Sequence, residues 1–184
     1  MRTPPPFPTS SQLAEPSGAA LELTWEMFGE LCRALALKVA GSDFRPEVVV
    51  GIAKAGVIPG AVISSILRAD FFSLKVSRNP GLDLERMDRP EILSEAPLQA
   101  RGRNVLLVDE ICTSGETLRV AGNALRNVAP REVRTATSIV KVNGHRPDYF
   151  ALETDAEVVF PWDRHVVNPD GALVPNPAYR DLLD

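Results

Sequence analysis

The segment from Asn104 to Thr117 constrains the fold of this chain more than any other. It opens with Val105–Val108, a short apolar run that is typical of a β-strand buried on both faces. Two acidic residues, Asp109 and Glu110, follow directly, where such a strand would leave its sheet. Polar residues come next, and then an apolar-periodic stretch over 118–128. The segment therefore predicts a strand, a polar loop and a helix, which is a unit of an α/β fold.

The polar loop of this segment has the composition of an anion-binding site. Its residues are small, hydroxyl-bearing or charged: Thr113, Ser114, Gly115, Glu116 and Thr117. The first turn of a helix leaves backbone N–H groups without partners and carries partial positive charge, so a phosphate fits there. The carboxylates of Asp109 and Glu110 would repel a phosphate but suit sugar hydroxyls or a magnesium ion. The alternative is an ordinary strand-to-helix turn with a Thr or Ser cap.

A second segment repeats this arrangement upstream. A buried-type strand is predicted over 47–52 and a helix over 57–67, and three small residues and a lysine join them: Ala53, Lys54, Ala55 and Gly56. Small residues let a backbone approach an anion closely, and Lys54 adds a positive charge. The same small residues also allow a helix to pack tightly on a strand, and this second interpretation stays open.

The rest of the chain continues the alternation of strands and helices. Apolar spacing predicts a helix over 23–40, with Thr24 as its N-cap and with Trp25 and Cys32 in the core. Further strands are predicted at 71–77, 132–142, 149–152 and 158–160. The charged stretch 78–103, broken by proline and glycine, is typical of a functional or disordered loop. The proline-rich segment 1–20 predicts a disordered or extended tail.

Composition narrows the class of protein. The chain has 184 residues, 45% of them hydrophobic, which suits a single domain over 21–184. There are 20 basic and 24 acidic residues, and no basic cluster indicates a nucleic-acid surface. Cys32 and Cys112 form no CxxC pair, so a cysteine metal site or disulfide framework is not expected. Without a long apolar run or a signal core, we expect a cytoplasmic protein and no membrane partner.

The strand, the acidic pair and the Thr-Ser-Gly-Glu-Thr loop together resemble the phosphoribosyl-pyrophosphate (PRPP) motif of type I phosphoribosyltransferases. The resemblance implies a Rossmann-like central parallel sheet flanked by helices, with a small hood built from the chain ends. It implies that Asp109 and Glu110 are catalytic, hold the ribose hydroxyls and bind Mg²⁺. It also implies that residues 113–117 bind the 5′-phosphate of PRPP, that residues 53–56 bind its pyrophosphate, and that a loop within 78–103 closes over the substrates.

The segment from Ser138 to Asp163 is similar to the purine-handling region of the 6-oxopurine members of this family, the xanthine–guanine and hypoxanthine enzymes. Lys141 matches a lysine that contacts the 6-oxo group of the base, and Pro161-Trp162-Asp163 matches a motif over the base. The resemblance implies a base site that is formed by Lys141, Phe160, Trp162 and Asp163.

Two positions depart from the 6-oxopurine pattern. Thr113 stands where those enzymes usually have an aspartate that faces N7 of the purine, and a threonine cannot act as a general base near neutral pH. Glu157 stands where they usually have an aromatic residue that stacks on the purine, and a carboxylate cannot stack. The departures concern the acceptor base and leave the PRPP part of the resemblance intact.

The sequence therefore predicts a Mg²⁺-dependent enzyme that moves ribose 5-phosphate from PRPP to a nucleobase nitrogen, with a 6-oxopurine as the first candidate acceptor. The resemblance implies PRPP and a nucleobase as partners, and a homodimer or homotetramer. Two alternatives stay open: a regulatory protein that binds PRPP or a nucleotide on the same fold, and a phosphoribosyltransferase with a non-purine acceptor. Of the two histidines, His145 is expected in a solvent-exposed turn and His165 nearer the base pocket.

Overall fold

The computed structural model describes residues 20–77 and 89–183. The chain divides into two compact units. The larger runs from Gly29 to Thr154, and the smaller takes in the chain ends, up to Phe28 and from Asp155. The tail predicted over 1–20 lies outside the described residues except for Ala20, which begins the first strand. Residues 78–88 of the predicted closing loop also lie outside the described residues.

The larger unit is built on a six-stranded sheet with the strand order β4-β3-β2-β5-β6-β7. Every neighbouring pair is parallel except β4 with β3. The strands are β2 (Val48–Ala53), β3 (Asp70–Ser77), β4 (Glu91–Ile92), β5 (Asn104–Cys112), β6 (Glu132–Val140) and β7 (Tyr149–Glu153). This mostly parallel central sheet confirms the predicted fold class.

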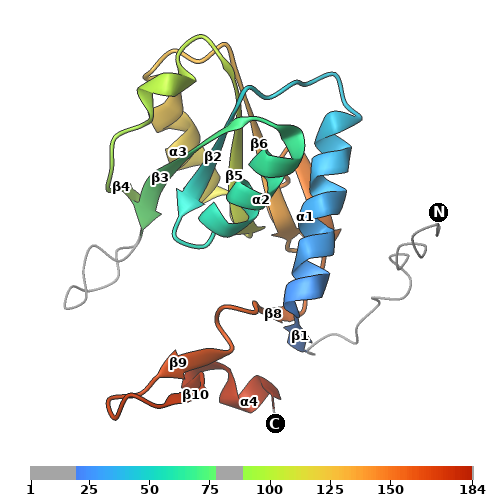
Figure 1. Ribbon diagram of the computed structural model, residues 1–184, viewed down its shortest axis with the longest axis vertical. Helices are drawn as coiled ribbons and strands as arrows, with labels where there is room; N and C mark the ends of the chain where they lie inside the picture. Colours follow the sequence, from blue (N-terminus) through green and yellow to red (C-terminus); the bar gives the residue numbers. More distant parts are fainter. Residues whose placement is uncertain (1–19, 78–88, 184) are drawn as a thin grey trace. The chain divides into compact units, whose positions relative to one another are not determined.

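Helices lie on both faces of this sheet. Helix α1 (Trp25–Ala40) precedes β2, α2 (Val57–Leu67) joins β2 to β3, and α3 (Glu116–Arg126) joins β5 to β6. The step from β2 to β3 and the step from β5 to β6 run in opposite directions along the sheet. Right-handed crossovers therefore place α2 and α3 on opposite faces (Figure 1). None of the helices in the described ranges has the length and hydropathy needed to cross a membrane.

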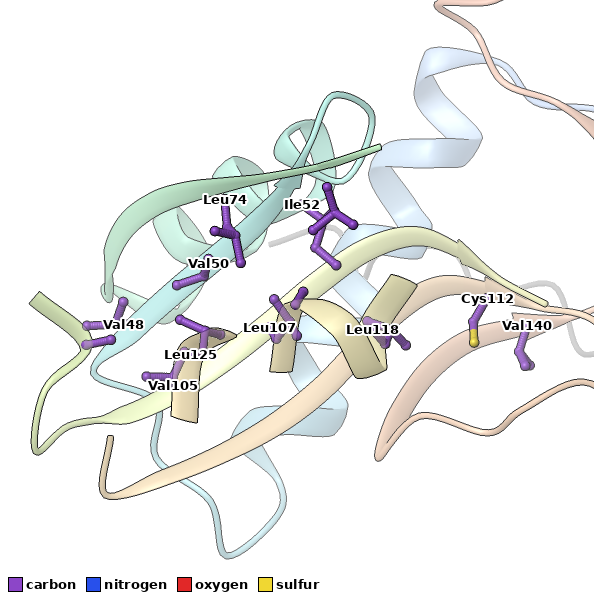
Figure 2. Packing of buried hydrophobic residues seen from close by; sticks show 13 residues of the cluster. Val48, Val50, Ile52, Leu74, Val105, Leu107, Cys112, Leu118, Leu125 and Val140 are labelled. Carbon is purple, nitrogen blue, oxygen red and sulfur yellow. The ribbon is translucent and has the colours of Figure 1, made fainter. Parts of the chain in front are cut away.

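Figure 2 shows the core on the α3 side of the sheet. Alternate residues of β2 and β5 point into it, because successive side chains of a strand face opposite sides. Its buried members from these strands and from α3 are Val48, Val50, Ile52, Val105, Leu107, Leu118, Ala121 and Leu125. Cys112 belongs to the same core, and its burial raises the pKa of the thiol to about 11. This thiol is therefore a small core group and not a nucleophile.

Strand β5 is longer than predicted, and this corrects the expectation that it leaves the sheet at Asp109. It continues to Cys112 because its pairing with β6 extends that far, with Cys112 opposite Val140. Its pairing with β2 stops earlier, at Val108 opposite Gly51. The acidic pair therefore stands on a strand that is bonded on its β6 side and open on the side of the turn between β2 and α2.

Helix α1 confirms two expectations and corrects a third. The Thr24 side chain caps the helix by accepting a hydrogen bond from the Met27 N–H at 3.1 Å, and Cys32 is fully buried. Trp25 was expected in the core, but it is 59% exposed. It is the first residue of the helix, and its ring has a neighbour in Trp162, with 5.9 Å between the ring centroids. The apolar spacing predicted the correct helix face but not the point at which the buried face ends.

The smaller unit contains short elements that the sequence analysis largely missed. Strand β1 (Ala20–Glu22) pairs in parallel with β8 (Glu157–Val159). Strands β9 (His165–Val167) and β10 (Leu173–Pro175) form an antiparallel pair, and α4 (Arg180–Leu183) follows. In this unit we expected only the strand at 158–160 and the start of the helix at 23–40. Strands of three residues are too short for an alternating pattern to stand out.

Candidate active site

A cavity of about 590 Å³ lies where β2 and β5 end at the same edge of the sheet. Residues 53–55 of the β2–α2 turn form one wall, and residues 109–117 of β5 and the β5–α3 turn form another. Ser77, which ends β3, and Pro90 also line it. Pro90 belongs to the stretch 78–103, within which the closing loop was predicted. Ser77 was not predicted, because nothing in its own sequence context indicates a site. The fold thus brings the acidic pair, the hydroxyl-rich loop and Lys54 to one cavity.

The acidic pair is partly removed from water. Asp109 is 7% exposed, and Glu110 is half-buried. Burial, together with the negative charge of Glu110, raises the pKa of the Asp109 carboxyl well above its usual range. In the described part of the chain no Lys or Arg forms an ion pair with either carboxylate. Carboxylates that the protein itself does not neutralise are suited to a bound cation or to the hydroxyl groups of a ligand.

Asp109→Asn should stabilise the fold at neutral pH. Burial favours the neutral form of this carboxyl, which is why its pKa is raised in the folded protein. Its contribution to stability is therefore complete below about pH 4, where the group is neutral in both states, and is lost as the pH rises through the folded pKa and the group ionises. A neutral amide avoids that loss, so we expect a gain of about 1–3 kcal/mol at pH 7. For a chain of this size each kcal/mol raises the melting temperature by about 2–4 °C. Thermal unfolding between pH 7 and about pH 4.5 tests this: the gain should shrink as the pH falls, and a variant that is less stable at pH 7 contradicts the burial argument.

The loop from Thr113 to Thr117 keeps backbone donors available. No described backbone carbonyl accepts from the N–H groups of Thr113, Ser114 or Thr117. Gly115 has a φ angle of +76°, a conformation that glycine adopts without strain. Helix α3 begins at the next residue, so its positive end lies at the cavity wall. The loop therefore has the features of a phosphate site, as the sequence predicted.

The β2–α2 turn approaches the acidic pair closely. Lys54 is exposed and lines the cavity, and the Ala53–Lys54 peptide bond is cis. Gly56 is buried and does not line the cavity. A Cβ atom added to Gly56 would lie 2.7 Å from Asp109 Oδ1 and 2.8 Å from the carbonyl oxygen of Val108. The absence of a side chain at Gly56 therefore lets this turn reach β5.

The residues predicted for the base site belong to both units. Lys141 follows β6 in the larger unit and does not line the cavity. In the smaller unit Phe160 stacks on Trp162, with 4.7 Å between ring centroids and 11° between ring planes. Asp163 follows Trp162, and its carbonyl accepts a hydrogen bond from the Asn176 amide at 2.8 Å.

Tyr179 is an aromatic residue of the smaller unit that was not predicted as part of the base site. Burial raises the pKa of Tyr179, and the negative charges of Asp163 and Glu157 raise it further. The tyrosine ring therefore lies near Glu157, the position where the 6-oxopurine pattern has an aromatic residue. Tyr179 sits in a short 3₁₀ turn, Pro177–Tyr179, of the proline-containing end, where no periodic pattern points to it. His165, in β9, is exposed.

The cavity residues supply only some of the ligands that a magnesium ion needs. Across residues 20–77 and 89–183, no group of three or more His, Cys, Asp or Glu side chains could hold a metal. Asp109 and Glu110 supply the oxygen ligands that Mg²⁺ prefers, and Mg²⁺ commonly takes its other ligands from substrate phosphates and water. This donor set fits a Mg²⁺ ion that binds together with a phosphorylated ligand.

Comparisons with known proteins agree with this geometry. A family model described as the phosphoribosyl transferase domain matches residues 23–169. Xanthine-guanine phosphoribosyltransferase of Cereibacter sphaeroides is 28% identical over 162 residues, which cover 80% of this chain and 89% of that protein. The purine phosphoribosyltransferase structure from Pyrococcus horikoshii has 26% identity and a TM-score of 0.69, and the match covers 81% of this chain and 97% of that one.

A further relative is longer than this chain. Phosphoribosyltransferase domain-containing protein 1 of Xenopus laevis is 32% identical over 121 residues, which cover 63% of this chain and 48% of the relative. The chain thus spans about half the length of that relative.

Proposed function

This chain belongs to the phosphoribosyl transferase domain family, and we propose that it transfers ribose 5-phosphate from PRPP to a nitrogen of a 6-oxopurine base and releases pyrophosphate. One observation carries the proposal: three features line a single cavity. They are the acidic pair Asp109 and Glu110, the 113–117 loop, which we call the phosphate-type loop, and the β2–α2 turn with Lys54. The names of two relatives, a xanthine-guanine and a purine phosphoribosyltransferase, support a purine acceptor.

Each wall of the cavity has a role in the proposed reaction. The N–H groups of the 113–117 loop bind the 5′-phosphate. Asp109 and Glu110 accept hydrogen bonds from the ribose hydroxyls, and their negative charge favours the positive charge that develops at the anomeric carbon. Lys54 and the small residues around it bind the pyrophosphate. Mg²⁺, when bound by the acidic pair, would neutralise the pyrophosphate as a leaving group.

The choice of base is assigned, from the family resemblance, to Lys141, Phe160, Trp162 and Asp163. The Lys141 ammonium group only donates hydrogen bonds, so it pairs with a 6-oxo group and not with the amino group of adenine. Trp162 is half-buried and offers an apolar surface for the ring of the base, and Asp163 offers a carboxylate. Phe160 is 5% exposed and supports this surface by stacking on Trp162. A homodimer or homotetramer and a cytoplasmic location stay predictions.

A panel of acceptor bases tests the proposal. With PRPP and Mg²⁺ present, pyrophosphate release is measured for guanine, xanthine, hypoxanthine, adenine, orotate and uracil. We expect turnover with at least one 6-oxopurine, and a kcat/KM that is about 100-fold or more lower for adenine, because adenine offers the Lys141 donor no acceptor at its 6-position.

The same panel distinguishes two other functions. Thr113, in place of the usual aspartate, favours a regulatory protein that binds PRPP without efficient chemistry. Calorimetric binding of PRPP with no pyrophosphate release on any base would support that regulator and contradict the enzyme. Turnover with orotate or uracil alone would keep the phosphoribosyltransferase and replace the purine as its acceptor.

A further inference from the structure

The turn that follows β6, residues 141–146, forms three hydrogen bonds with the end of β5 and the start of the 113–117 loop. The Lys141 N–H donates to the Cys112 carbonyl at 3.0 Å, and the His145 N–H donates to the Thr113 carbonyl at 2.7 Å. The Cys112 thiol donates to the His145 carbonyl, with 3.3 Å between sulfur and oxygen. A Cβ atom on Gly144 would lie 2.6 Å from the Thr113 carbonyl oxygen. The turn therefore packs directly against the loop.

These hydrogen bonds fix the direction of the loop's own donors. A trans peptide unit directs its carbonyl and its N–H in opposite directions. Because the carbonyls of Cys112 and Thr113 point toward the turn, the N–H groups of Thr113 and Ser114 point away from it. Both residues line the cavity, and within the described ranges neither N–H has a backbone acceptor. The turn thus sets the orientation in which the loop meets a ligand.

The ring of His145 makes a separate contact with the loop. A Cβ atom on Gly115 would lie 2.5 Å from the imidazole Cγ and Cδ2, so the ring rests on the glycine backbone. Gly115 holds a φ of +76°, yet an unrestrained glycine samples many other conformations. The ring occupies the space beside this backbone and restricts it. His145 is exposed, as expected for a turn, but the sequence did not indicate that it covers Gly115.

We propose that His145 is a positioning residue for the phosphate loop, and that its ring holds Thr113–Gly115 in the conformation that binds the 5′-phosphate of PRPP. This inference rests on the proposed function, which makes that loop the phosphate site. A loop that is ordered before its ligand arrives loses less conformational entropy on binding. Without the ring, the loop loses more conformational entropy on binding, and this weakens the binding of phosphorylated substrates. The acidic pair and its chemistry are unchanged.

His145→Ala removes the ring and keeps the backbone hydrogen bonds. We expect the KM for PRPP and the Kd for ribose 5-phosphate, measured by calorimetry, to rise about 3- to 10-fold, with kcat within about twofold of the unsubstituted protein. His145→Phe restores a ring without the imidazole nitrogens and should return both constants close to their original values. Val142→Ala is the matched control, because it shortens an exposed side chain of the same turn, and it should change neither constant.

The outcomes separate this inference from the function on which it rests. If the unsubstituted protein binds neither ribose 5-phosphate nor PRPP, the proposed function fails. If it binds them and His145→Ala binds them equally well, the positioning role is wrong. The role is also wrong if His145→Phe is as weak as His145→Ala, because the contact would then not act through packing. Melting temperatures of all variants verify that they fold.

Discussion

Asp109→Asn combined with Glu110→Gln should lower kcat with PRPP and a 6-oxopurine by about 10²- to 10⁴-fold, which is about 3–5 kcal/mol of transition-state stabilisation. The two amides keep the size of the side chains and remove both negative charges. These charges lie at the cavity, and within residues 20–77 and 89–183 no basic side chain pairs with them. Removing them therefore weakens the stabilisation of the positive charge that develops at the anomeric carbon of the substrate.

A second double variant controls for the change in net charge. Asp43→Asn with Glu132→Gln also removes two acids from the larger unit, where both pair with Arg134 on the surface. Exposed pairs of this kind contribute little, so its kcat should stay near that of the unsubstituted protein. Because Asp109→Asn is expected to raise stability, a lost rate cannot be attributed to unfolding. Near-normal turnover of the Asp109→Asn, Glu110→Gln variant would remove the acidic pair from the mechanism.

The part of the site that could be predicted is the part that is local in the sequence. Strand, acidic pair, loop and helix follow one another in β5 and α3, so composition and spacing alone indicated their order. The same holds for the β2–α2 turn with Lys54. Two such units in adjacent parallel strands place their turns at one edge of the sheet. The meeting of the two turns at one cavity was therefore implied by the fold class.

What could not be predicted depends on contacts between distant segments. The extra length of β5 comes from its partner β6, and no property of residues 109–112 alone indicates it. The contact of the His145 ring with Gly115 depends on how the 141–146 turn folds back onto the 113–117 loop. Tyr179 reaches the neighbourhood of Glu157 through a short turn without periodic pattern. In each case a tertiary contact determines where the residue lies, because the local sequence is compatible with several positions.

Gly56→Ala should damage the site although Gly56 does not line the cavity. The added methyl group would lie 2.7 Å from Asp109 Oδ1 and 2.8 Å from the carbonyl oxygens of Ile52 and Val108. Two of these three neighbours are backbone atoms of the central strands, so relief requires the β2–α2 turn to move away from β5, or Asp109 to leave its position. Overpacking of this kind costs about 1–3 kcal/mol of stability. A displacement of about 1 Å at the reacting groups costs about 100-fold in rate.

We therefore expect Gly56→Ala to lower kcat/KM by about 100-fold and to lower the melting temperature by several degrees, at about 2–4 °C per kcal/mol. Gly29→Ala is the matched control, since a Cβ atom on this α1 glycine would meet no atom within 4 Å. It should leave kcat/KM unchanged and raise stability by about 0.5–1 kcal/mol, because alanine favours a helix over glycine. Steady-state kinetics and thermal unfolding of the two variants compare the same glycine-to-alanine change at a position without space for a methyl group and at a position with space for it. If Gly56→Ala were as active as Gly29→Ala, the close approach of the two turns would not be what assembles the site, and the acidic pair would have to be positioned by β6 alone.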